Sequence, residues 1–284
     1  MISSIFLITN KGISMANPTN EEIKSWIDVS IEGINTFNKQ LQHEKQQEHQ
    51  SIYTSLALEY VDFGRAKFLR GDPVNDVRPE FRKSAECIET SFRMAYEESH
   101  PKYLGERADL VWISMTLAID GFHAALLAGD FELGRRLAIW AQIPSDEIDE
   151  AGNPKHSQSL VANYMHALKY IFLGDDTKAL DYAWATENWF AKKGEPTKNR
   201  FHRNFFHRCR MVRAILEKNQ DLFEASMQVQ LKSHAWEAVH DDIADTSEAY
   251  IYVDGVALCN LALHKGMKIN FEAGVIPEGL LIGA

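Results

Sequence analysis

One short phrase, in which apolar residues lead into Gly-Asp, occurs three times in the chain and constrains its fold more than any other feature. It is written "FLRGD" at 68–72, "LLAGD" at 126–130 and "IFLGDD" at 171–176. The apolar residues can close a buried helical turn, Gly can adopt the left-handed conformation that ends a helix, and Asp can cap the next helix. Each copy therefore predicts a helix end joined tightly to a helix start.

Weaker copies of the phrase follow toward the C-terminus. In "ILEKNQD" (215–221) Asn replaces Gly, and in "LALHKG" (261–266) only the helix end remains. The three full copies lie roughly 45 to 60 residues apart, which is close to the length of two helices with their connections. The spacing predicts an all-α fold of stacked antiparallel helical hairpins, a repeat-like helical bundle of about ten helices.

Helical periodicity covers almost the whole chain from Thr19 onward. Thr19 and Glu22 form a capping-box pattern, which predicts the start of the first helix. A second helix should end at Gly71, and Asp72 with Pro73 should supply the N-cap and first-turn proline of a third. The remaining helices are predicted at about 106–128, 131–142, 157–173, 177–192, 198–218, 222–233 and 247–265.

The same reading divides the chain into a short N-terminal segment and one large domain. Residues 1–18 are expected to be disordered or extended, with Met15 as an alternative translation start. Residues 19–284 are predicted to form a single all-α domain, because the Gly-Asp joint recurs on both sides of the polar loop at 144–156. That loop is nonetheless the best candidate for a division into two subassemblies.

Composition excludes several classes of protein. A net charge of −10 and a pI near 5.6 argue against a protein that wraps nucleic acid, and favour a basic partner. Cys87, Cys209 and Cys259 stand alone without a CxxC pattern, so buried thiols in a reducing cytoplasm are expected. The N-terminal apolar stretch is too short for a secretory signal, and no apolar run of about 18 residues predicts a membrane-spanning helix.

No catalytic or cofactor-binding motif is present. The chain lacks a GxSxG elbow, a phosphate-binding glycine run and a GxGxxG turn. His43 and His49 are six residues apart and would not share a helical face, and Glu237 with His240 forms only half of a di-iron motif. No metal and no cofactor are predicted, and a helical enzyme with a metal site assembled from scattered residues stays open as an alternative.

A basic segment at 200–213, "RFHRNFFHRCRMVR", carries five Arg and no acid. Its apolar stripe, from Phe201 through Phe205, Cys209 and Val212 to Leu216, is predicted to be buried. The other faces would then form a basic ridge of Arg203, His207, Arg210 and Arg213. Two interpretations stay open, a solvated helix face paired with neighbouring acids and a contact for phosphate or an acidic partner.

An acidic segment at 233–254 contains neither Lys nor Arg. Its middle is expected to be a loop that leads into a capped helix near Ser247, with carboxylates that nothing nearby compensates. Aromatic residues beside such charges are typical of an interface that binds a basic partner, and an ordinary acidic rim is the alternative. The predicted partner-binding residues are Trp236, Glu237, Asp241, Asp242, Asp245, Glu248 and Asp254.

The order of several sequence blocks resembles a known family. These blocks are "FLRGDPVNDVRPEFRKSAE", "FHAALLAGDFELGRRLA", "ALKYIFLGDDTKAL" and "VDGVALCNLALHKGMKINFEAGVIPEGLL". Together they resemble immunity proteins of bacterial polymorphic toxin systems, and most of all the Imm49 family, over roughly residues 53–281. The early block "RGDPVNDVRP" is also similar to PoNe-type immunity proteins.

The resemblance implies a non-enzymatic cytoplasmic protein that binds a cognate toxin, encoded by the adjacent gene, and blocks its active site or substrate groove. A basic, nuclease-type toxin would suit the acidic chain. Because the matching blocks are structural joints, the resemblance assigns no individual binding residue. The alternative is a helical-repeat adaptor or regulator that binds a peptide or a small signalling molecule, and neither function involves a membrane or direct contact with nucleic acid.

Overall fold

The computed structural model describes residues 7–9, 12–14, 17–45, 48–142, 158–191, 194–196 and 198–283. In these residues the prediction of an all-α fold of about ten helices is confirmed, with one short antiparallel pair of strands before the first helix. The elements are β1 (Leu7–Thr9), β2 (Gly12–Ser14), α1 (Asn20–His43), α2 (His49–Arg70), α3 (Val74–Tyr96), η2 (Gly105–Arg107), η3 (Leu110–Ile113), α4 (Met115–Ala128), α5 (Phe131–Trp140), α6 (Gln158–Phe172), α7 (Asp176–Ala191), α8 (Arg200–Glu217), α9 (Gln220–His240), η5 (Ser247–Ala249), α10 (Val253–His264) and η6 (Glu278–Leu280).

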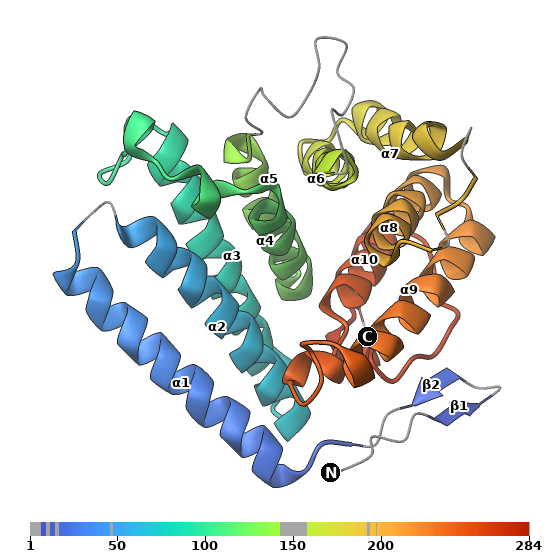
Figure 1. The fold of residues 1–284 in the computed structure, drawn as a ribbon, viewed down its shortest axis with the longest axis horizontal. Coiled ribbons are helices and arrows are strands. Elements are labelled where there is room, and N and C mark those ends of the chain that lie inside the picture. Colours follow the sequence, from blue (N-terminus) through green and yellow to red (C-terminus); the bar gives the residue numbers. More distant parts are fainter. Residues whose placement is uncertain are drawn as a thin grey trace.

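The helices form two groups with α4 between them. Figure 1 shows α1, α2 and α3 side by side in one group and α7 to α10 in the other. On the side of the first group, helix α4 packs against α3 and α5. On the side of the second group, it packs against α6 and α10. One continuous hydrophobic core, which includes Leu56, Phe122, Tyr164 and Leu258, extends through both groups.

The recurring phrase forms the joints of four helical hairpins: α2–α3, α4–α5, α6–α7 and α8–α9. Gly71, Gly129 and Gly174 each adopt a positive φ at the end of a helix, as predicted. The N–H of the following Asp donates to a carbonyl five residues earlier at 2.9 to 3.1 Å, the bond that closes a Schellman-type helix end. Asp130 and Asp175 then cap the next helix by accepting from backbone N–H groups at 2.9 and 3.0 Å.

Two details of the joints differ from the prediction. Asp72 does not cap α3; Pro73 occupies the N-cap position, and Asp72 instead accepts hydrogen bonds from Arg70. At the fourth joint Lys218 rather than Asn219 takes the left-handed conformation, with φ of 57°. Asn219 is the cap of α9, because its side chain accepts from the Leu222 N–H at 3.1 Å.

Three predicted helix boundaries were wrong. The predicted helix at 106–128 is broken into η2, η3 and α4, because Asp109 caps η3 and Ser114 caps α4. Helix α9 does not stop near Ser233 but continues to His240, with Ser233 buried within it. The predicted helix from Ser247 is a single 3-10 turn, and α10 begins six residues later. The loop proposed as a division, at 144–156, and Met15 lie outside the described residues.

Close packing places α4 at the centre of the fold. A Cβ at Gly121 would lie 2.5 Å from a Leu137 methyl group and 2.9 Å from one of Ile88, so α3 and α5 can approach α4 only because this residue is glycine. Further along, buried Asn260 on α10 donates to the Leu126 and Leu280 carbonyls at 3.0 and 3.2 Å. These bonds tie the end of α4 and the C-terminal segment to α10.

The two groups of helices also meet on the side opposite α5 and α6. Arg65 on α2 is buried and donates from Nε to the Ser247 hydroxyl at 3.1 Å and from Nη1 to Glu248 at 3.3 Å. The rings of Trp26 and Tyr250 are 5.7 Å apart. The η5 turn therefore binds the first two helices to the C-terminal group, although nearly two hundred residues separate them in sequence.

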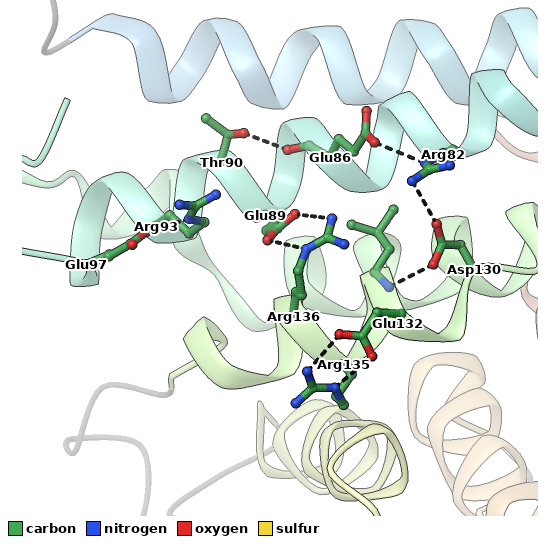
Figure 2. A network of polar contacts seen from close by, with 11 residues as sticks. Arg82, Glu86, Glu89, Thr90, Arg93, Glu97, Asp130, Glu132, Arg135 and Arg136 are labelled. Carbon is green, nitrogen blue, oxygen red and sulfur yellow. Dashed lines mark hydrogen bonds and ion pairs between the residues drawn. The ribbon is translucent and has the colours of Figure 1, made fainter. Parts of the chain in front are cut away.

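A network of ion pairs fixes α5 against α3 (Figure 2). Arg136 forms a forked pair with the buried Glu89, with both N···O distances 3.0 Å. Arg82 bridges Glu86 on its own helix and Asp130 at the start of α5. Because every charge drawn in this network has a partner within it, we attribute to it a structural role.

All three cysteines are buried and free of disulfides, as expected. Burial raises the pKa of the Cys87 and Cys209 thiols to about 12, so both stay protonated and unreactive near neutral pH. None of the described helices combines the length and the apolarity that crossing a membrane requires.

Candidate functional site

The acidic segment begins on the last turns of α9, crosses the η5 turn and ends on the first turn of α10. Most of its carboxylates have a cationic partner, so the expectation of uncompensated charge was wrong for four of the six. Arg200 at the start of α8 pairs with Glu237 and Asp241. The partners come from helices distant in sequence, which is why the local absence of Lys and Arg was misleading.

The other two paired carboxylates lie on the inner side of the segment. Glu248 pairs with Arg65 on α2. Asp254 pairs with Arg208 on α8, and its Oδ1 lies 2.8 Å from Nδ1 of His123 on α4. Asp254 is therefore a central charge of the fold and not a free contact for a partner.

Asp242 and Asp245 differ from these four. Both are exposed in the turn after α9, and neither carboxylate forms an ion pair with any described residue. Asp245 also has a positive φ of 63°, in the left-handed region that Asp tolerates better than most residues. These two residues carry the uncompensated charge that the sequence predicted.

Trp236 lies beside this turn and remains partly open to solvent. Its side chain is 49% exposed. The Arg200 guanidinium carbon lies 4.3 Å from the centroid of the indole, and the His240 ring stacks on it at 4.9 Å. An exposed Trp whose ring contacts both a cation and an imidazole is a group of the kind that anchors protein interfaces.

The predicted basic ridge on α8 is largely neutralised, which favours the first of its two interpretations, a helix face paired with neighbouring acids. Arg210 and Arg213 both pair with Glu187 on α7 at 3.3 and 3.1 Å, and Arg213 also stacks on Trp184. Arg210 pairs in addition with Glu195. Desolvation raises the pKa of Glu187, and the two arginines partly offset that shift.

The rest of the ridge also turns inward. Arg203 lies against Ser233 on α9, with a donor–acceptor distance of 3.5 Å. His207 is buried, and desolvation lowers its pKa to about 4, so it is neutral near pH 7. Phe201, which was predicted to be buried, is 44% exposed, because it occupies the first turn of α8 where the core ends. The interpretation as a helix face paired with neighbouring acids therefore fits the ridge.

A charged centre between α4, α8 and α10 was missed by the sequence analysis. Desolvation by itself would raise the pKa of the Asp254 carboxyl, but Arg208 and then His123 outweigh it and hold this pKa well below its usual range. The other nitrogen of His123, Nε2, is 2.8 Å from the hydroxyl of buried Tyr164. One available signal was Arg208 itself, which lies on the apolar stripe of its helix, where an Arg needs a buried partner.

Asp120 lies one turn before His123 on α4 and faces the same centre. Desolvation raises the pKa of this exposed carboxyl to about 7, with a further contribution from Asp254 and an opposing one from Arg208. Part of the Asp120 side chain contacts water, while surrounding protein displaces water from its carboxyl group and disfavours the charged form. The carboxyl is therefore only partly ionised at neutral pH.

The described residues contain no group of three or more His, Cys, Asp or Glu side chains able to hold a metal ion. At the charged centre Arg208 and His123 both contact Asp254, and Tyr252 donates to Gln230 at 2.9 Å, while the buried Nε of Arg208 has no hydrogen-bond partner among the described residues. Its geometry is that of a buried polar network that fixes the relative positions of three helices.

Comparison with known proteins gives a family. The model of the family Imm49, described as Immunity protein 49, matches residues 78–280 and so covers most of the chain, from α3 to η6. A search of curated proteins found no match, and a search of solved structures found none either. The matched region includes the charged centre, Trp236 and the acidic turn. The chain therefore belongs to the Imm49 family of immunity proteins.

Proposed function

We propose that this protein neutralises a cognate toxin domain by binding it directly and blocking its active site or substrate groove. The family match over residues 78–280 carries the proposal, because it spans nearly all of the helical scaffold. Direct binding requires no chemistry from the immunity protein. We further propose that the toxin is encoded by the adjacent gene and that the protein acts in the cytoplasm, where such a toxin would reach its target.

The charge of the chain suggests what the toxin is like. With a net charge of −10, the protein would be attracted over a distance to a basic domain, such as a nuclease whose cleft binds phosphates. Carboxylates placed in that cleft could take the position of phosphates. We propose that the exposed turn with Asp242 and Asp245 supplies this charge beside Trp236.

Co-expression tests this function. The toxin domain from the neighbouring gene should arrest growth when produced alone in a bacterial host, and co-production of this protein should restore growth. The purified pair should elute together in size-exclusion chromatography at micromolar concentration, since a lasting complex buries of the order of 1,600 Å². A second Imm49 protein from an unrelated toxin locus serves as the control, and absence of a complex would overturn the proposal.

A second candidate function rests on one cavity. A pocket of about 680 Å³ lies between the end of α10 and the C-terminal segment, lined by Leu263, Phe271 and Ile276 with Glu272 and Glu278 at its polar side. That volume is within the range of sites for small ligands. It favours the alternative of a regulator that binds a peptide or small signalling molecule, and Phe271→Ala would then weaken the binding of that ligand.

A further inference from the structure

Large apolar side chains lie around the first turn of α8, where α7 and α9 end. The four residues, Trp189, Phe201, Trp236 and Val239, are 37%, 44%, 49% and 39% exposed. They come from the last turns of α7, the first turn of α8 and the last turns of α9. We call these four residues, with Arg200, His202 and His240, the α8-end surface.

Ring contacts link the members of this surface in two sets at the helix end. The ring centroid of His202 is 5.9 Å from that of Trp189 and 6.0 Å from that of Phe201. On the other side, Arg200 covers Trp236. Arg200, Phe201 and His202 are consecutive residues of the first turn of α8, so the aromatic groups of α7 and α9 lie around the same helix end.

The surface is rigid before any partner arrives. Arg200 is held by Glu237 and Asp241 while it stacks on Trp236, and His240 covers the same indole. Phe201 packs on buried Phe205 at 4.9 Å. Side chains that are already fixed lose little conformational entropy on binding, and Trp and Arg are the residues that most often dominate an interface.

The charge around the surface indicates the kind of partner. Arg200 is already neutralised by its two carboxylates, whereas exposed Asp242 and Asp245, a few residues beyond α9, have no cationic partner among the described residues. Val29 and Ile31 on α1 also lie beside exposed carboxylates, those of Asp28 and Glu32, but no aromatic side chain of α1 is among the largely exposed apolar residues. An apolar centre with unpaired carboxylates at its rim fits a partner that presents an apolar side chain flanked by Lys or Arg.

We propose that the α8-end surface is the anchor for the toxin domain, which inserts an apolar side chain against Trp236 and Phe201 and places basic residues on Asp242 and Asp245. This inference rests on the proposed function and deepens it by assigning the contact. The surface belongs to the part of the chain matched by the family model.

Paired substitutions test this assignment. The dissociation constant of the complex with the purified toxin domain from the neighbouring gene is measured for wild type, for Trp236→Ala with Phe201→Ala, and for the matched control Val29→Ala with Leu58→Ala. The first pair should weaken binding at least 100-fold, and the control less than threefold. Circular dichroism and a urea titration establish that each variant is folded, and Trp236→Lys alone provides a single-site test if the double variant unfolds.

The possible results separate the two proposals. If wild type forms no complex with the toxin domain, the proposed function fails and this inference fails with it. If wild type binds and the Trp236 and Phe201 variants bind equally tightly, only this inference is overturned. Sedimentation of the protein alone tests whether a second copy of the chain covers the surface. A dimer that Trp236→Lys converts to monomers would show that it does, and would overturn the assignment.

Discussion

Two parts of the acidic segment contrast with each other. We call the exposed turn with Asp242 and Asp245 the outer end and Asp254 on α10 the inner end, although Asp254 is only nine positions beyond Asp245. At the outer end Asp242 and Asp245 are exposed and unpaired among the described residues. At the inner end Asp254 contacts Arg208 and His123 in the centre of the fold. The comparison teaches that like charges close together in sequence can be paired inside the fold at one position and left exposed at another.

Removing the inner charge should have the largest effect on stability. Asp254→Asn leaves Arg208 and His123 without their anionic partner in a largely desolvated position, so the free energy of unfolding should fall by about 3 kcal/mol. Urea denaturation measures the change. Asp242→Asn, the matched outer variant, should stay within about 0.5 kcal/mol of wild type. Equal losses for the two variants would contradict the division between the ends.

Low pH should have the next largest effect on the stability of the fold, through the buried His234 on α9. Desolvation lowers the pKa of His234, which stacks on Tyr252, to about 4 from a usual value of 6.5. The folded state therefore binds fewer protons than the unfolded state, and stability present above pH 6.5 is lost as the pH falls toward 4. His234→Gln should reduce this loss by about 2 kcal/mol at pH 4. Urea midpoints between pH 7.5 and 4 provide the measurement, and a variant with the wild-type slope would rule out His234 as the cause.

Asp120 offers a test with the opposite sign. Because its pKa is raised to about 7, the folded state retains a proton that the unfolded state releases, and stability falls as the pH rises from about 4 to 7. Asp120→Asn should therefore stabilise the protein at pH 8, by about 1 kcal/mol after allowing for solvent screening, and have little effect at pH 4. Thermal unfolding at the two pH values checks this. Destabilisation at pH 8 would mean that the Asp120 carboxylate is favourably paired.

Substitutions at the outer end should change stability least. Their effect should be on the rate of association with the toxin domain. Asp242→Asn with Asp245→Asn should slow association with a basic toxin domain about two- to fivefold at low salt and lower the salt dependence of the rate. Stopped-flow binding at several salt concentrations measures both. The control Glu21→Gln with Asp28→Asn removes two charges from α1 and should have a smaller effect. Equal slowing by both pairs would indicate that net charge alone steers the toxin.

Much of the fold could be predicted because its signals are local. The Gly-Asp phrase specifies a helix end within six residues, so Gly129 and Gly174 could be placed without knowledge of any partner. The Thr19–Glu22 capping box was also confirmed, with the Glu22 N–H donating to the Thr19 hydroxyl at 3.2 Å. Boundaries failed where a cap residue inside a helical pattern, such as Ser114, began a new helix.

The candidate site was less predictable because its signals are not local. Nothing near Glu248 in sequence indicates that Arg65, on the second helix, will neutralise it. The exposure of Phe201 likewise depends on where α7 and α9 stop beside α8. Trp236 was named as a partner-binding residue and is exposed, but its contact with Arg200 of α8 was not predicted.

The sequence by itself therefore determined the helix ends at the Gly-Asp joints, most of the apolar faces and the series of helical hairpins, since these depend on backbone conformation and periodicity over a few residues. Only the tertiary structure decided which charges remain free. Coulomb interactions act across space without regard to chain distance, so the pairing of Asp254 with Arg208, and the absence of a described partner for Asp242, followed from how the hairpins pack.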